Sequence, residues 1–146
     1  MKLATANVLV TGGAGFIGTR LAALLAAEGA RITVVDNLST GSRASLPART
    51  DVVEMDLPDR LFPDLGGGGE FDAVFHLAGP AYVPPSVDHP LEDLRWSAEL
   101  TLQVLEAVRK ASPRTPLIYT SSAAVYGNPE RQPISEAHPP SPVSPD

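Results

Sequence analysis

Residues 8–18 of the chain are Val8-Leu9-Val10-Thr11-Gly12-Gly13-Ala14-Gly15-Phe16-Ile17-Gly18, an apolar run that leads into spaced glycines. The apolar run predicts a buried strand, and the alanine- and leucine-rich residues that follow predict a helix over residues 16–28. Each glycine has its own expected task. Gly12 turns the chain off the strand, Gly15 lets backbone N–H groups approach a ligand, and Gly18 lets the helix pack closely. Unpaired N–H groups and the helix dipole then favour an anion at this turn.

An acidic residue follows at the distance expected of a ribose-binding group. A second apolar run, residues 32–35, ends on Asp36, about 20 residues after the glycines. This order of elements, a strand, a glycine turn, a helix, a second strand and an acidic residue, predicts a dinucleotide site. The alternative is a structural turn that binds no ligand. Because a carboxylate accepts both ribose hydroxyls but repels a 2′-phosphate, we expect NAD rather than NADP as the cofactor. Arg43 weakens that preference unless it is a solvated loop charge.

Composition excludes several classes of function. The 146 residues suit one domain, and 11 basic against 17 acidic residues give a net charge of −6, which argues against nucleic acid as a partner. There is no cysteine, and the three histidines, His76, His89 and His138, are widely separated, so we expect no metal site. No apolar run approaches the roughly 20 residues that span a bilayer, and the N-terminus is a poor signal peptide. We therefore expect a cytoplasmic protein without a membrane partner.

Five apolar runs predict a parallel sheet. They are near-continuous rather than alternating, which is typical of strands buried on both faces. They lie at residues 8–10, 32–35, 52–55, 73–77 and 117–120. The expected fold is α/β, a three-layer doubly wound Rossmann fold with strand order 3-2-1-4-5. Residues 1–127 are expected to form the NAD-binding domain, and the proline-rich residues 128–146 a loop.

A long helix is expected over residues 86–111, and its apolar residues divide between two faces. The face expected to cover the sheet has apolar residues three and four apart, namely Leu91, Leu94, Ala98, Thr101, Leu105 and Val108. Trp96 and Leu100 fall on another face, which could dock a partner subunit in a homodimer, unless Trp96 is simply an exposed side chain. His76, at the end of the fourth strand, is expected to be a packed histidine, with an acid or base as the alternative.

Four motifs together resemble the extended short-chain dehydrogenase/reductase family of NAD-dependent sugar epimerases and dehydratases, most closely its UDP-glucose 4-epimerase branch. They occupy residues 11–18, 36–41, 76–79 and 121–127. The resemblance implies a UDP-sugar substrate and an NAD site lined by Phe16, Ile17, Asp36, Asn37, Leu38, Ser39, Thr40, Gly41, Asp56, Leu57, Leu77, Ala78 and Gly79. Ser97 stands where the family has an asparagine at the cofactor. Asp56 is placed to accept from an adenine amino group, or else it only initiates the turn before Pro58.

The resemblance also assigns the catalytic hydroxyl to Ser122. In the family this hydroxyl binds the sugar oxygen, and a Tyr-x-x-x-Lys pair about two dozen residues later supplies the base. Asp146 stands at the tyrosine's position, and the printed sequence contains neither partner. We therefore expect the NAD-binding front part of an epimerase, truncated before its base and inactive as this chain. The alternatives are a non-catalytic NAD-binding module or partner subunit and, least favoured, a shortened domain that no longer folds.

One substitution separates two reactions of the family. The 4,6-dehydratases carry an Asp-Glu pair directly after the active-site hydroxyl, whereas this chain has Ala123 and Ala124. Alanine cannot move the protons that elimination of water needs. The resemblance therefore favours epimerase-like hydride transfer through a 4-keto sugar.

Overall fold

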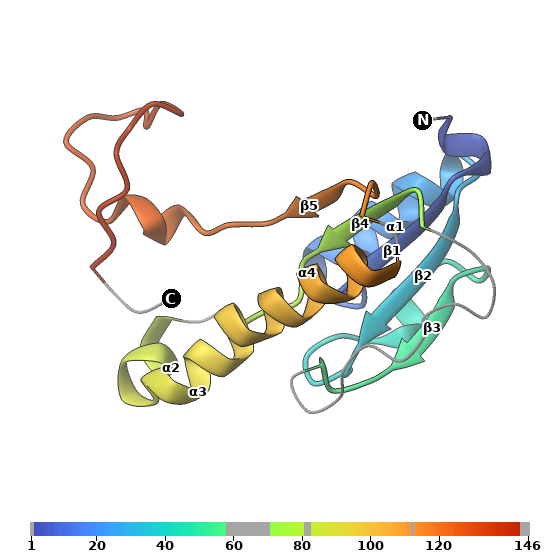
Figure 1. Cartoon of the computed structure of the whole chain (residues 1–146), viewed down its shortest axis with the longest axis horizontal. Coiled ribbons are helices and arrows are strands. Elements are labelled where there is room, and N and C mark those ends of the chain that lie inside the picture. The colour runs from blue at the N-terminus through green and yellow to red at the C-terminus, as the bar shows by residue number, and fades with distance from the viewer. Residues whose placement is uncertain (1, 58–70, 81–82, 112, 144–146) are drawn as a thin grey trace.

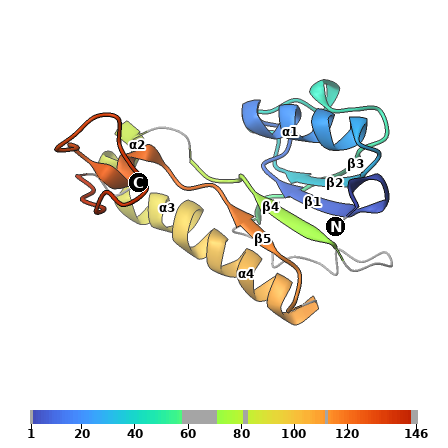
Figure 2. The ribbon, with the colours of Figure 1, turned by 90° about the horizontal axis from the view of Figure 1, so that it is seen from above.

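A computed structural model describes residues 2–57, 71–80, 83–111 and 113–143. Its five parallel strands form one sheet in the order β3-β2-β1-β4-β5. The strands are β1 (Asn7–Thr11), β2 (Arg31–Asp36), β3 (Asp51–Glu54), β4 (Ala73–His76) and β5 (Leu117–Tyr119). The predicted fold class and strand order are confirmed. Helix α1 (Phe16–Ala27) lies on one face of the sheet and α4 (Leu100–Ala111) on the other (Figures 1 and 2).

Each face of the sheet has its own core, because neighbouring side chains of a strand point to opposite faces. The core beneath α1 consists of Ala6, Val8, Val10, Ala22, Leu25, Ile32 and Val34. The core beneath α4 consists of Leu9, Val35, Met55, Leu57, Val74, Leu100 and Val104. β1 contributes to both, so the central strand is buried on its two sides. This burial fixes the end of β1, where the glycine turn begins.

The first helix lies where the sequence predicted it, within one residue. α1 begins after Gly15 and ends at Ala27, with Gly29 at a φ of +86°, a left-handed conformation that favours glycine. Short 3₁₀ helices lie at Leu3–Thr5, Arg43–Ser45 and Ala123–Tyr126. None of the helices in the described ranges has the length and apolar character that crossing a bilayer requires.

The expected continuous helix over residues 86–111 is wrong. The chain forms α2 (Val83–Asp88), breaks at His89, and begins α3 (Pro90–Leu94) with Pro90 in the first turn, where its missing N–H costs no hydrogen bond. A π-helix (Arg95–Glu99) then joins α3 to α4. A π-turn contains one residue more than an α-turn, so residues on its two sides no longer share a face at α-helical spacing.

The face expected to cover the sheet is therefore wrong at most of its positions, although Val108 packs against the core beneath α4 and the Thr101 hydroxyl reaches His76 on β4. Leu91 is 81% exposed, and Leu94 and Leu105 are exposed as well, whereas Leu100 is 2% exposed and packs in the core with Val104. Leu100 thus faces the sheet rather than a second, outward surface. Leu100 is therefore covered by the core and not available to a partner subunit. A homodimer through the segment 86–111 stays a prediction.

After β5 the chain runs away from the sheet, toward the end of the molecule where α2 and α3 lie (Figures 1 and 2). The described part of the proline-rich segment folds back on residues 123–127. Ser141 N–H donates to the Val125 carbonyl at 2.8 Å, and the rings of Tyr126 and His138 meet edge to face at 5.7 Å. Residues 144–146, which include the position of the missing tyrosine, lie outside the described residues.

Candidate functional site

A pocket of about 780 Å³ opens where the carboxyl ends of β1, β2 and β4 meet the start of α1 and the π-helix. This is the edge at which parallel α/β sheets bind their ligands. Its walls are Gly12, Gly15, Phe16, Ile17, Gly18, Val35, Asp36, Asn37, Ser39, Thr40, Met55, Leu57, Leu77, Ala78, Gly79, Pro80, Trp96, Leu100 and Thr120. Most residues that the sequence assigned to a cofactor are therefore brought together in one place.

The glycine turn has no room for a side chain at Gly12, Gly13 or Gly18, and the limits at Gly12 and Gly18 are set by backbone atoms. Gly12 has a φ of +67°, and a Cβ there would lie 2.6 Å from the Ala78 backbone nitrogen. A Cβ on Gly18 would lie 2.5 Å from the Gly12 carbonyl oxygen. Gly18 therefore lets α1 pack against the turn itself. A Cβ on Gly15 would meet only the Gly12 carbonyl oxygen, at 3.3 Å, so no other described part of the chain closes the mouth of the turn.

The N-terminus of α1 supplies donors at this mouth. The first N–H groups of a helix have no carbonyl partner within it, and they carry the positive end of the helix dipole. Phe16 and Ile17 begin α1, and both side chains line the pocket with exposures of 86% and 59%. Large apolar side chains left open to solvent beside free donors suit a ligand with an anionic group and flat apolar parts.

Asp36 connects the glycine turn to the loop after β2. Its Oδ2 accepts from the Ala14 N–H and its Oδ1 from the Leu38 N–H, both at 2.8 Å. The Ala14 carbonyl accepts in turn from Ser42 N–H at 3.3 Å, and Gly41 packs against Ala14 so closely that a Cβ would lie 2.6 Å away. Each carboxylate oxygen has a second lone pair, so Asp36, which lines the pocket, keeps acceptor capacity for a ligand hydroxyl.

The loop after β2 is held by Asn37. The Asn37 side-chain oxygen accepts from the Ser39 N–H at 3.1 Å and the Ser39 hydroxyl at 2.7 Å. Its amide nitrogen donates to Asp56 Oδ1 at 3.4 Å. Asp56 is exposed and lies outside the pocket wall, whereas the next residue, Leu57, is buried within it. The carboxylate thus stands at the rim of the site.

His76 is packed, as the sequence predicted. It is 1% exposed, with Nδ1 at 2.6 Å from the Thr11 hydroxyl and Nε2 at 3.1 Å from the Thr101 hydroxyl. Burial disfavours the imidazolium and lowers the pKa of His76 below its ordinary value. The Tyr119 ring lies 5.8 Å from the imidazole. Neither imidazole nitrogen is left to act on a ligand as an acid or base.

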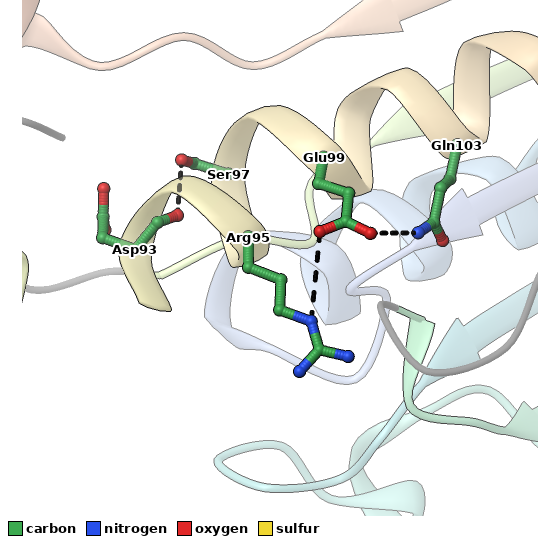
Figure 3. A network of polar contacts seen from close by, with 5 residues as sticks. All are labelled: Asp93, Arg95, Ser97, Glu99 and Gln103. Atoms are coloured by element: carbon green, nitrogen blue, oxygen red, sulfur yellow. Dashed lines mark hydrogen bonds and ion pairs between the residues drawn. The ribbon is translucent and has the colours of Figure 1, made fainter. Parts of the chain in front are cut away.

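The π-helix brings Trp96 to the pocket and turns Ser97 away from it. The Ser97 hydroxyl donates to the Asp93 carbonyl at 2.6 Å, a bond within its own helix (Figure 3). Arg95 and Gln103 both contact the Glu99 carboxylate, at 4.0 and 3.2 Å (Figure 3). The cofactor role expected of Ser97 therefore has no support in the pocket wall.

Ser122 also lies outside the pocket wall. It caps the 3₁₀ helix at Ala123–Tyr126, where its Oγ accepts from the Ala124 N–H at 3.1 Å, and it is exposed. Thr120, two residues earlier, does line the pocket. Of the residues assigned from the sequence, the wall leaves out Leu38, Gly41, Asp56, Ser97 and Ser122. Leu38, Gly41 and Asp56 instead pack or hydrogen-bond next to it.

Several wall residues were not assigned from the sequence. They are Val35, Met55, Pro80, Trp96, Leu100 and Thr120. The sequence shows Trp96 and Leu100 as an apolar pair. A ligand as large and flat as adenine or nicotinamide needs an apolar wall, and this need is the signal that could have assigned the pair to the pocket.

Comparison with known proteins identifies the family of the chain. The model of the NAD dependent epimerase/dehydratase family matches residues 8–145. The chain belongs to this family. The probable UDP-arabinose 4-epimerase 1 of Oryza sativa subsp. japonica is 40% identical over 153 residues, which covers 95% of this chain and 35% of that protein. The predicted family is thereby confirmed.

Solved structures of the family have the same fold. UDP-glucose 4-epimerase from Brucella ovis in complex with NAD superposes with a TM-score of 0.86 at 42% identity, over 96% of this chain and 43% of that one. UDP-glucose 4-epimerase from Thermotoga maritima with UDP-glucose gives 0.84 at 35% identity, over 95% and 46%. The chain therefore spans less than half the length of these three family members.

Proposed function

We propose that the chain binds NAD in the described pocket and forms the cofactor-binding part of a UDP-sugar 4-epimerase. One observation carries the proposal: the open N-terminus of α1 and the carboxylate of Asp36 face the same pocket, at the ends of adjacent strands. An anion-binding helix end and a diol-binding acid at this spacing suit a dinucleotide.

The glycine turn is the proposed site of the pyrophosphate. Gly15 presents no Cβ at the mouth, and Phe16 and Ile17 carry the N–H groups that begin α1. No lysine or arginine lines the pocket within the described residues, so backbone amides and the helix dipole supply the positive potential. The exposed Phe16 and Ile17 side chains then cover the bound cofactor.

The end of β2 is the proposed site of the adenosine. Asp36 accepts the ribose hydroxyls through the lone pairs that Ala14 and Leu38 leave unused. Met55 and Leu57 form an apolar wall for adenine, and Asp56 at the rim is placed for its amino group. Asn37, Ser39 and Thr40 close this half of the pocket.

The end of β4 is the proposed site of the nicotinamide. Two small residues, Ala78 and Gly79, line the pocket together with Trp96 and the buried Leu100. When bound, NAD would supply hydride transfer, taking up a hydride from the sugar and returning it. The Ser122 hydroxyl accepts from Ala124, so its own proton is free to donate to a sugar oxygen.

Binding is tested with Trp96, the single tryptophan of the chain, whose emission reports on the pocket it lines. Titration with NAD is expected to change this emission to saturation, whereas NADP is expected to bind at least about 10-fold more weakly because its 2′-phosphate meets the Asp36 carboxylate. Asp36→Asn is expected to narrow the difference between the two cofactors. Asp51→Asn, at the opposite end of the sheet, is the control and should preserve it. Equal affinity of the unaltered chain for NAD and NADP contradicts the role of Asp36.

Catalysis is tested separately. No Tyr-x-x-x-Lys pair follows Ser122 in the 146 residues, and tyrosine is a poor base at neutral pH without a nearby cation. This chain is therefore expected to bind NAD without measurable epimerisation of UDP-glucose. Turnover by the purified chain, free of any longer family member, would show that another residue acts as the base.

A further inference from the structure

A directed chain of hydrogen bonds runs through His76. The Thr101 hydroxyl donates its one proton to the Ser97 carbonyl at 2.7 Å, so toward His76 it can only accept. His76 Nε2 must therefore carry the proton, and Nδ1 accepts from the Thr11 hydroxyl at 2.6 Å. The Thr11 hydroxyl in turn accepts from the Ala78 N–H at 3.4 Å. With the Thr101 proton on the Ser97 carbonyl, the donors allow one arrangement, a neutral imidazole protonated on Nε2.

This chain of bonds joins three elements that wall the pocket. Thr11 ends β1 and directly precedes Gly12 of the glycine turn. Ala78 follows β4 and lines the pocket, and its backbone lies against Gly12. On the other side, the Ser97 carbonyl belongs to the π-helix, one residue after Trp96. His76 itself lies outside the wall, so any effect it has on a ligand passes through these partners.

We propose that His76 is a positioning residue for the NAD site, holding the glycine turn and the π-helix at the separation that the nicotinamide half requires. The inference rests on the proposed NAD binding and extends it to a residue that does not touch the cofactor. A protonated imidazole has two donors and no acceptor, so the Thr11–His76 bond must reverse and the Thr11 hydroxyl loses the acceptor of its own proton. Cofactor affinity therefore depends on His76 remaining neutral.

The surroundings of His76 support this dependence. The titratable groups on the elements around it are Tyr119 on β5, Glu92 and Asp93 on α3, Arg95 and Glu99 on the π-helix, and Glu106, Arg109 and Lys110 on α4. None of them contributes to the lowered pKa of His76, which is due to burial alone. Without a carboxylate partner, the described environment gives the imidazolium no compensation.

The first test is the pH profile of NAD affinity, measured on the full chain by calorimetry from about pH 8 to about pH 5. Affinity is expected to fall as His76 gains its proton at the acid end. His76→Asn keeps an acceptor near the Nδ1 position but cannot titrate, so its profile should be flat over this range. His89→Asn, an exposed histidine whose side chain makes no cap, is the control and should keep the unaltered profile.

The second test removes one hydroxyl at a time. Thr101→Val leaves the His76 Nε2–H without its acceptor and is expected to weaken NAD about 5-fold, with Thr101→Ser restoring the affinity. Thr115→Val is the matched control, because the Thr115 hydroxyl also donates to a carbonyl, that of Phe71 at 2.8 Å, but at the opposite end of the sheet. Thr115→Val should lower stability by about as much as Thr101→Val and leave NAD affinity unchanged.

A third measurement does not depend on any variant. Nitrogen chemical shifts of His76 in the unaltered chain should report the neutral form protonated on Nε2, and NAD should displace its titration to lower pH. Protonation on Nδ1, or an affinity that Thr101→Val and pH leave unchanged, overturns the positioning role while NAD binding stands. Failure of the unaltered chain to bind NAD at every pH overturns the proposed function and this inference with it.

Discussion

The turn after β1 and the helical segment after β4 keep their shapes by different means. In the turn, backbone atoms of different segments are in direct contact. Gly12 lies against Ala78 and Gly18 lies against Gly12, so neither Gly12 nor Gly18 has space for a Cβ. In the helical segment, side chains decide the packing, with Leu100 and Val104 buried and Leu91 exposed on the same run of helix. A change in the turn therefore reaches the backbone of several elements, whereas a change in the helix matters only on one face.

The largest expected effect tests the turn. Gly12→Ala forces a left-handed φ on a side chain and drives its Cβ into the Ala78 backbone, so the free energy of unfolding should fall by about 3 kcal/mol. Gly79→Ala is the matched control, since a Cβ there meets nothing within 4 Å, and its stability should stay within about 0.5 kcal/mol. Urea unfolding followed by circular dichroism measures both. Similar losses in the two variants would show that backbone contact does not set the turn.

The next effect tests the helical segment. Leu100→Ala empties a site in the core beneath α4 and should cost about 3 kcal/mol. Leu91→Ala changes a side chain that is 81% exposed and should cost less than about 0.5 kcal/mol. The same unfolding measurement applies. If Leu91→Ala is the more destabilising of the two, then the π-helix does not rotate the apolar face as described.

The sequence specified the sheet and most of the pocket because those features depend on short-range rules. Near-continuous apolar runs predicted all five strands to within one or two residues. Gly12 and Asp36 lie at fixed distances along the chain from the strands that carry them, so their place at the carboxyl edge follows once the strand order is known. Beyond the strand order, no contact between distant segments has to be known to predict them.

The helical segment could not be predicted in the same way. Its periodicity assumed one unbroken α-helix, and the π-turn shifted the phase between Leu94 and Leu100. The π-turn is a pattern of backbone hydrogen bonds. Beside it, the Ser97 and Thr101 hydroxyls donate to carbonyls four residues earlier. Neither residue type by itself marks such a turn. For that reason Trp96 and Leu100 were expected on an outer surface and lie instead in the pocket wall.

The smallest expected effect joins the two regions through His76. Because burial lowers the pKa of His76 in the folded chain, the unfolded chain binds more protons once the pH falls below the ordinary value of 6.5. Stability should therefore be unaffected by this group above pH 6.5 and fall below it, until the folded form is protonated too. One proton limits the slope to about 1.4 kcal/mol per pH unit. Thermal unfolding of the unaltered chain and of His76→Asn across this pH range isolates the contribution of His76 to stability, since only the unaltered chain has this histidine.

Parallel profiles of stability against pH would mean that His76 titrates alike in the folded and unfolded chain. In that case the imidazole is not held neutral between the glycine turn and the π-helix, and each region keeps its shape independently of the other.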